Sequence, residues 1–331
     1  MERIAWILED GCIYWKDVVL LLAVLAAVCC FLGLYLRQGS GAAALILVPL
    51  AGTASVVLGR AAHWYFRPEQ YESLMTAVTD LGRGEFALMG AFAGCFLAAV
   101  LVRMLGLTKD LPGLLDCMSL AGALGIGLGR LASLFDTSDR GMVLAGEMPF
   151  AAATVNPVSG AEQWRLATFL LQAGAAGGIF LVLLLFYLTG ARKRGDIALL
   201  FLLFYGASQV VLDSTRYDGL MLRSNGFLSA VQLLSAAAVV LAVTVFAVRL
   251  VRAGGWKKWH GPLWLVQAGG FALAGYMEYY VQRHGHRAAF AYSIMMAALT
   301  AVVLLTLLTR HLALVEEKKH EAWLQALKEG V

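Results

Sequence analysis

The stretch from Leu115 to Gly141 reads LDCMSLAGALGIGLGRLASLFDTSDRG. Its first half is an apolar run spaced by glycines, and Arg130 stands where that run ends. Two aspartates, three hydroxyl side chains and Gly141 follow within a dozen residues. An arginine at the mouth of an apolar helix is costly to place in a membrane, and such residues are usually functional. We therefore predict a membrane helix that ends in a polar site.

The composition of the whole chain agrees with a membrane protein. Of 331 residues, 60% are hydrophobic and 15% are charged, and the mean hydropathy is +0.74. So much apolar surface has no core to enter in a soluble domain, which excludes that class. The first apolar run is too long for a cleaved signal peptide and predicts a retained membrane helix. The five cysteines show no disulfide or metal spacing, so we expect neither a metal nor a cofactor.

Nine apolar runs have about the length that crosses the hydrocarbon region of a bilayer. They lie at about 18–36, 41–65, 86–106, 114–134, 164–190, 195–213, 226–250, 262–282 and 288–311. Alanine, leucine and glycine dominate these runs, which favours helices over barrel strands. The predicted fold is all-α: a polytopic membrane protein with about nine spans, made of a seven-helix core and two more helices.

Basic residues predict the orientation, because short cytoplasmic loops collect lysine and arginine. If the N-terminus is outside and the C-terminus is in the cytoplasm, most of the basic loop residues lie inside. They include the compact cluster at 192–194. Under this orientation the long segments 66–85 and 135–163 lie outside. The basic clusters are short, and no extended basic stripe predicts binding to nucleic acid.

Polar side chains also gather at two other outer helix ends, at spacings of three or four that place them on one helix face. They are Arg60 and His63 in the second span, and Gln209, Asp213 and Arg216 in the sixth. Together with Arg130, three arginines stand at outer helix ends. Guanidinium groups in a partly dry cleft suit a phosphate. The alternative is an internal salt-bridge lattice, for example between Asp213 and Arg216.

The stretch at 129–141 resembles the signature of the prolipoprotein diacylglyceryl transferase family, Gly-Arg-x-Gly-Asn-Phe-x-Asn-x-Glu-x-x-Gly. Gly129, Arg130 and Gly141 agree with it. The interior differs, since Ala132, Ser133, Leu134, Asp136 and Ser138 stand at the family's glycine, asparagine, phenylalanine, asparagine and glutamate positions.

Other segments resemble the same family in the same order. IYWKD at 13–17 keeps Trp15, and LGRAAHWYF at 58–66 keeps Arg60 with His63 in place of a tyrosine. GEFALMGAFAG at 84–94 keeps three glycines but has Met89 at the histidine position. The segment 192–216 resembles the family's sixth-span helix, and Gln232 with Ser235 match a further element. The resemblance covers about residues 10–250, which predicts a transferase-like domain at 1–252 and an extension at 253–331.

The resemblance implies an enzyme of the bacterial cytoplasmic membrane. Its reaction displaces glycerol phosphate from phosphatidylglycerol with the lipobox cysteine thiol of a preprolipoprotein. It implies catalytic roles for Arg130 and Asp213. His63 is a further catalytic candidate, because it faces the same cleft and an imidazole can take a proton near neutral pH. The implied substrate-binding residues are Arg60, Arg216, Ser133, Gly141, Gln209 and Asp136. Methionine cannot act as a base, and Gln209 replaces an arginine, so His63, Glu85, Asp136 or Asp139 would have to accept the proton.

Two other functions fit the same residues. A homologue without transfer activity would bind an anionic phospholipid head group at the arginines. A transporter would place charges near the centres of its spans and repeat its halves. The charges here gather at span ends and no internal repeat is evident, so the transporter ranks last.

Overall fold

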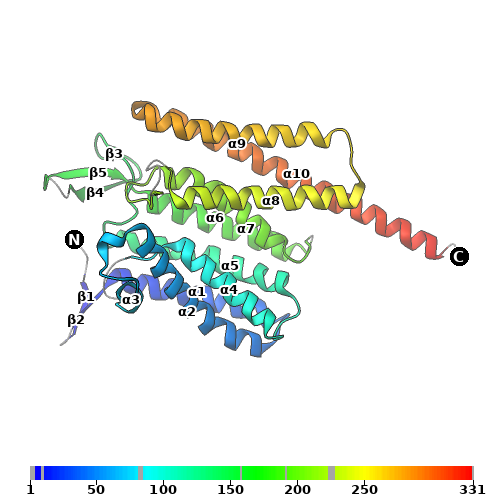
Figure 1. The fold of residues 1–331 in the computed structure, drawn as a ribbon, viewed down its shortest axis with the longest axis horizontal. Coiled ribbons are helices and arrows are strands. Elements are labelled where there is room, and N and C mark those ends of the chain that lie inside the picture. The colour runs from blue at the N-terminus through cyan, green and yellow to red at the C-terminus, as the bar shows by residue number, and fades with distance from the viewer. Residues whose placement is uncertain are drawn as a thin grey trace. The chain divides into compact units, whose positions relative to one another are not determined.

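The computed structural model describes residues 4–8, 11–80, 85–156, 159–190, 192–222 and 228–329. The main helices are α1 (Trp15–Tyr35), α2 (Gly41–Phe66), α3 (Leu74–Thr79), α4 (Leu88–Met104), α5 (Leu111–Arg130), α6 (Thr168–Leu188), α7 (Asp196–Ser214), α8 (Ala230–Gly254), α9 (His260–Arg283) and α10 (Ala288–Glu329). Three 3₁₀ turns are η1 (Pro68–Gln70), η2 (Leu131–Leu134) and η3 (Gly285–Arg287). Figure 1 shows these elements along the chain.

Each of the nine predicted spans corresponds to one of these helices, and the all-α polytopic class is confirmed. Within the described ranges, seven helices are long and apolar enough to cross a membrane: α1, α2, α5 with η2, α6, α7, α8 and α10. Helix α4 is apolar but has only 17 residues. Helix α9 has 24 residues but does not match the apolarity of the seven. The predicted count of nine is therefore not established.

Two small antiparallel sheets lie outside the helices, where the sequence predicted no strands. The first pairs β1 (Ile4–Leu8) with β2 (Gly11–Tyr14). The second has the order β3 (Val143–Leu144), β5 (Glu162–Leu166), β4 (Ala151–Val155). This second sheet lies in the long segment between α5 and α6 and follows the polar stretch that begins at Arg130.

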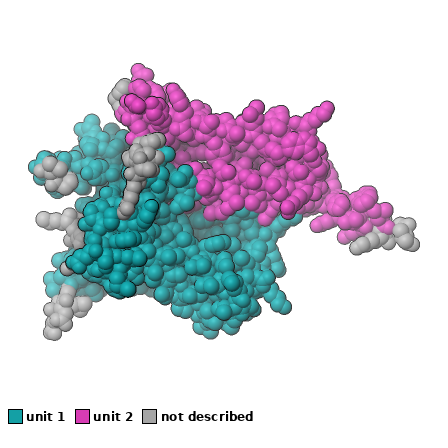
Figure 2. All heavy atoms as spheres, viewed as in Figure 1, with its two compact units in different colours: residues 1–201, 215–234 teal, residues 202–214, 235–331 magenta. Residues whose placement is uncertain are grey.

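The chain forms two compact units, which Figure 2 colours separately. The first comprises residues 1–201 and 215–234, and the second comprises residues 202–214 and 235–331. These units are defined by contacts within the structure, and their boundaries fall inside helices α7 and α8. The domain boundary that the sequence predicts at residue 252 therefore stays a prediction.

Small residues let helix α5 pack closely in the first unit, where it contacts both α1 and α6. A Cβ atom at Gly125 would lie 2.9 Å from the Ala27 Cβ, and one at Gly127 would lie 3.2 Å from the Gly177 nitrogen. Close approach of this kind depends on small side chains. It fixes the end of α5, where Arg130 stands.

A buried carboxylate fixes the start of helix α7 in the first unit. Asp116 on α5 is fully buried, and its oxygens accept hydrogen bonds from the Gly195 and Ala198 N–H groups at 2.8 and 2.9 Å. Arg192 lies 3.5 Å from the same carboxylate. The first N–H groups of a helix have no partner within the helix. Asp116 supplies that partner from a neighbouring span.

Helices α9 and α10 form a hairpin in the second unit. Buried Gln267 donates to the Thr306 hydroxyl at 3.1 Å, and Lys257 pairs with Glu316 at 3.1 Å. Helix α10 has 42 residues, about 63 Å at the rise of an α-helix, whereas hydrocarbon is about 30 Å thick. The charged tail is thus a direct continuation of the last span.

Candidate functional site

The loop after Arg130 pairs with the segment after helix α7. A β-bridge joins Gly141 to Arg216, and the Tyr217 N–H donates to the Arg140 carbonyl at 2.9 Å. Arg165 on β5 donates to the Gly141 carbonyl at 3.2 Å and lies over the Tyr217 ring. This pairing brings Arg216 beside the stretch that contains Arg130, as the sequence predicted for these two arginines.

Gly141 stands where no larger residue fits. Its N–H donates to the Leu166 carbonyl at 2.7 Å. A Cβ atom at this position would lie 2.5 Å from the Thr168 hydroxyl and 3.0 Å from the Thr215 carbonyl. Contacts under 3.0 Å essentially never occur at a real Cβ atom, and the Thr168 contact is well below that distance. The glycine that closes the signature is therefore required by the crossing of the two segments.

The carboxylate of Asp139 lies between the two arginines. Its Oδ2 is 2.6 Å from Arg130 Nη1, and its Oδ1 is 2.7 Å from Arg216 Nη2. The Ser133 hydroxyl donates to Oδ2 at 3.1 Å. Asp139 has a φ of +55°, a conformation that residues other than glycine seldom adopt. Such strain persists only where surrounding contacts enforce it, and here two ion pairs do so.

The charges around Asp139 control its ionisation. Burial alone would raise the pKa of this carboxyl group. The positive charges of Arg130 and Arg216, with hydrogen bonds from Arg130 and Ser133, outweigh burial and hold the pKa at about 2. The hypothesis that burial raises the pKa of Asp139 and makes it a base is thus wrong, because two guanidinium groups stabilise the carboxylate.

Asp218 extends the cluster. It accepts from Arg216 Nε at 2.9 Å, and its other oxygen accepts from the Asp139 N–H at 2.9 Å. The sequence interpretation missed this residue. An arginine and an aspartate two residues apart directly after helix α7 are the signal that would have found it.

Asp136 turns toward its own loop. Its Oδ1 accepts from the Ser138 N–H at 2.7 Å and the Ser138 hydroxyl at 2.6 Å, an arrangement typical of aspartate in turns. Arg140 donates to the carbonyls of Ser133 and Asp136 at 3.1 and 2.9 Å and lies over the Phe169 ring. These contacts hold the shape of the loop that presents Asp139. No sequence pattern had indicated this role for Arg140.

Arg60 has different contacts from those that a phosphate-binding role would give it. It is fully buried, and its guanidinium donates to three backbone carbonyls: Ala77 at 2.7 Å, Asp80 at 2.6 Å and Glu85 at 3.3 Å. It also lies near the rings of Tyr71 and Phe86. Arg60 thus holds the segment between α2 and α4, and the sequence did not show that its targets are carbonyls.

His63 is buried one helical turn from Arg60. Its Nδ1 lies 2.7 Å from the Tyr71 hydroxyl, and its Nε2 lies 3.9 Å from Glu85 Oε2. The Tyr71 hydroxyl also donates to the Glu85 carbonyl at 3.5 Å. The structure therefore brings His63 and Glu85 together, two residues that the sequence proposed as separate proton acceptors.

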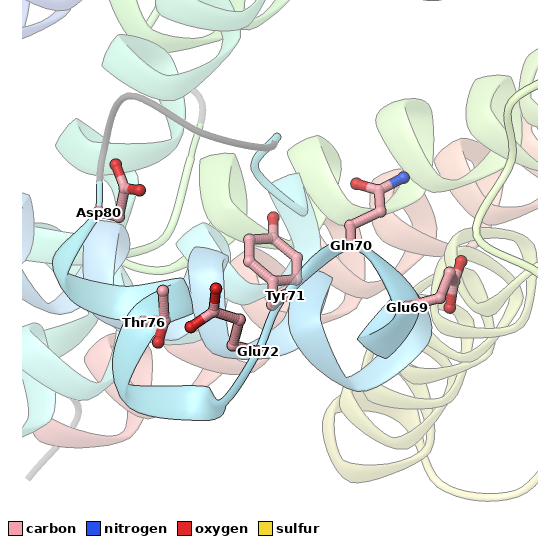
Figure 3. Close-up of a pocket in the computed structure, with 6 residues that line it drawn as sticks. All are labelled: Glu69, Gln70, Tyr71, Glu72, Thr76 and Asp80. Atoms are coloured by element: carbon pink, nitrogen blue, oxygen red, sulfur yellow. The ribbon is translucent and has the colours of Figure 1, made fainter.

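Tyr71 also borders a pocket of about 240 Å³ in the segment between α2 and α4, drawn in Figure 3. The pocket is lined by Glu69, Gln70, Tyr71, Glu72, Thr76 and Asp80. Three carboxylates repel a phosphate. The pocket is therefore distinct from the predicted anion site at the arginines.

Gln209 and Asp213 are buried on α7 in the second compact unit. Their spacing of four places them on one face of the helix, as predicted. Their roles in substrate binding and catalysis stay predictions.

Comparison with known proteins identifies the family of this chain. A family model described as prolipoprotein diacylglyceryl transferase matches residues 3–248. The chain belongs to that family. Residues 249–331, which include α9 and α10, lie outside the match.

Three relatives share the name phosphatidylglycerol–prolipoprotein diacylglyceryl transferase. The protein from Geobacillus kaustophilus is 25% identical over 265 residues, which are 78% of this chain and 95% of the relative. That from Lactococcus lactis is 33% identical over 90 residues, 27% of this chain and 33% of the relative. That from Methylobacillus flagellatus is 29% identical over 169 residues, 50% of this chain and 62% of the relative.

Asp139 lies one residue after the glutamate position of the family signature. The glutamate of the family signature corresponds to Ser138, and the residue that joins the two arginines is the next one along. The left-handed backbone at Asp139 turns its side chain to the arginines. In this chain, the acidic group between the two arginines therefore comes from residue 139 and not from residue 138, the glutamate position of the signature.

Proposed function

We propose that this multi-pass membrane protein transfers the diacylglyceryl group of phosphatidylglycerol to the lipobox cysteine of preprolipoproteins. Its location would be the bacterial cytoplasmic membrane, with the N-terminus outside and the C-terminus in the cytoplasm. The observation that carries the proposal is the convergence of Arg130 and Arg216 on one carboxylate, in a chain of this family.

The two arginines are suited to hold a phosphodiester. Each side chain is 14% exposed, so both are largely withdrawn from solvent but still accessible. Guanidinium groups stay charged under such conditions and bind oxygen anions in pairs. Asp139 already shows how two oxygens of one anion are held from two sides. A lipid phosphate also has two free oxygens, and each of them could accept hydrogen bonds from one of the two arginines.

In the reaction, a thiolate attacks the glyceryl carbon, the sulfur–carbon bond forms and the bond from carbon to the phosphate oxygen breaks. Negative charge collects on the departing glycerol phosphate. Fixed cations at that position stabilise the transition state. We assign this role to Arg130 and Arg216. Ser133, Asp136 and Gly141 maintain the conformation of the loop that carries Asp139. Arg60 holds the outer segment. His63 acts on the thiol side. The resemblance further suggests a catalytic role for Asp213 and a substrate-binding role for Gln209.

The test is complementation. Cells depleted of their own transferase would receive this chain, and a prolipoprotein would be examined for lipid modification. Modification is expected, and its absence at good membrane expression would overturn the proposal. Arg130→Ala should abolish modification and reduce the phosphatidylglycerol retained on purification, whereas Arg37→Ala, an exposed arginine of an inner loop, should change neither.

A second candidate is binding of an anionic phospholipid without transfer. It is favoured by Met89, which has no proton chemistry at the family's histidine position. Retention of phosphatidylglycerol that depends on Arg130, without any lipid-modified prolipoprotein, would select this candidate.

A further inference from the structure

The departure of glycerol phosphate adds negative charge to the phosphate. In phosphatidylglycerol the phosphate is a diester with a single negative charge, whereas a phosphate monoester carries about −1.5 to −2 charges at pH 7. The added charge comes from the acceptor sulfur, which attacks as a thiolate and ends as a neutral thioether. A cation that accelerates the reaction must therefore meet charge that the bound lipid does not yet carry.

The positive charges of Arg130 and Arg216 are already matched by carboxylates. Asp139 binds both arginines, at 2.6 and 2.7 Å, and Asp218 accepts from Arg216 Nε at 2.9 Å. Two positive and two negative side chains thus form the cluster. Because their formal charges cancel, a phosphate that becomes more negative calls for a further cation beside them.

Arg67 is a cation placed next to this cluster in the first unit. It directly follows helix α2, and its Nη2 donates to the Gly219 carbonyl at 3.3 Å. Gly219 is the residue after Asp218, whose carboxylate accepts from Arg216 Nε and from the Asp139 N–H, each at 2.9 Å. One hydrogen bond and one peptide step therefore connect the Arg67 guanidinium to the crossing that holds the other two arginines.

Arg67 is held more loosely than those two arginines. Its side chain is 38% exposed, whereas those of Arg130 and Arg216 are each 14% exposed. Its hydrogen bond to Gly219 is longer than the usual range of about 2.7–3.2 Å. Its Nη1 lies 3.9 Å from Oε1 of the exposed Glu69, and exposed ion pairs contribute little. The guanidinium can exchange these contacts for a phosphate oxygen at small cost.

An exposed and loosely held arginine suits a leaving group better than a buried one. The product must be bound while its charge develops and must then escape into water. A guanidinium donates two parallel hydrogen bonds to a phosphate and keeps its charge, which a lysine ammonium matches only as a point charge.

We propose, on the basis of the proposed function, that Arg67 binds the phosphate of glycerol phosphate as this group departs. The acceptor thiol loses its proton to solvent, and the sulfur electron pair forms the bond to the glyceryl carbon. The bond from that carbon to the phosphate oxygen breaks, and the electron pair stays on the oxygen. Arg67 turns from Glu69 to the phosphate, and the glycerol phosphate leaves from this arginine into water.

The experiment measures transfer from phosphatidylglycerol in mixed micelles to a synthetic lipobox peptide by the purified full-length protein. Arg67→Ala should lower kcat about 10- to 100-fold, with the KM for phosphatidylglycerol within about twofold, because the added charge is absent from the bound lipid. It should raise the inhibition constant of added glycerol 1-phosphate about tenfold. Arg67→Lys should keep part of kcat, and Arg37→Ala, an exposed arginine between α1 and α2, should change neither constant.

Glu69→Gln separates phosphate binding from a structural role. Without the competing carboxylate, Arg67 is more available, so the inhibition constant of glycerol 1-phosphate should fall about two- to threefold. A merely structural arginine would gain no affinity from this change. Methylguanidinium added in solution should restore part of the rate of Arg67→Ala and leave the wild-type rate unchanged.

Glycerol 1-phosphate also tests the site without turnover, since it should raise the thermal midpoint of the wild type and not that of Arg67→Ala. An active wild type whose inhibition constant stays the same in both Arg67→Ala and Glu69→Gln would overturn this inference and leave the proposed function standing. A wild type that is protected through Arg67 but transfers nothing would remove the proposed function and keep the phosphate site. A wild type with neither property would remove both.

Discussion

Asp139 Oδ1 and Arg216 Nη2 lie 2.7 Å apart, although one residue follows helix α5 and the other follows helix α7. This ion pair closes the crossing between the two segments that Gly141 makes possible. It also sets the spacing between Arg216 and Arg130, because the same carboxylate binds both.

Asp139→Asn should destabilise the protein by about 3 kcal/mol, because removal of one partner leaves two largely buried guanidinium groups without their shared anion. Thermal unfolding in detergent measures the change. Phosphatidylglycerol should protect the variant more than the wild type, since a bound phosphate replaces the lost anion. Equal protection of both proteins would contradict a phosphate site at these arginines.

Acid should weaken the same cluster. The pKa of Asp139 is about 2 in the folded protein, below the value of about 3.9 of a free aspartate. A depressed carboxyl pKa contributes stability that is complete above the unfolded value and is lost as the pH falls through the folded value. The thermal midpoint should therefore stay level from pH 7 to about pH 5 and fall toward pH 2. Asp139→Asn should show a shallower fall, and parallel curves would remove this carboxylate as the cause.

Gly141→Ala should disrupt the crossing by steric overlap. The added methyl group would meet the Thr168 hydroxyl, the Leu166 Cβ and the Thr215 carbonyl within 3.0 Å. Overpacking of this kind costs about 1–3 kcal/mol, and transfer activity should fall as Arg216 moves. Gly146→Ala is the matched control, because that loop glycine has nothing within 4 Å of an added Cβ atom. Similar thermal midpoints for the two variants would contradict the steric argument.

The sequence predicted those features of the protein that a local pattern of residues specifies. Each of the nine apolar runs lies on a helix, because a span of hydrocarbon demands continuous apolar residues, and seven of these helices in the described part of the chain are long and apolar enough to cross a membrane. Spacing placed Arg60 and His63 on one buried helix face. The partners of the charged groups were not predictable, since Asp139 reaches the arginines only through a positive φ and Arg60 binds backbone carbonyls. Residue types alone do not show which backbone carbonyl a side chain will bind or which residue will have a positive φ.

Asp116→Asn should weaken the start of helix α7. An amide keeps one acceptor oxygen, but its NH₂ group would face one of the Gly195 and Ala198 N–H donors. A buried unsatisfied group costs about 1–3 kcal/mol, which thermal unfolding would detect. Asp17→Asn, at the exposed first turn of α1, should change stability by only a few tenths of a kcal/mol. Faster hydrogen exchange at residues 195–199 in the Asp116 variant alone would confirm the local cause.

Arg60→Lys distinguishes a scaffold role for this arginine from a phosphate-binding role. Lysine keeps the charge but cannot reach the carbonyls of Ala77, Asp80 and Glu85 together, as the planar guanidinium does. The segment 67–80 should then be cut faster by protease, with a stability loss of about 2 kcal/mol or more. Arg67→Lys, whose arginine makes one long hydrogen bond to the Gly219 carbonyl, is the control and should resist protease like wild type. A higher KM for phosphatidylglycerol without faster cleavage would instead assign Arg60 to the lipid phosphate.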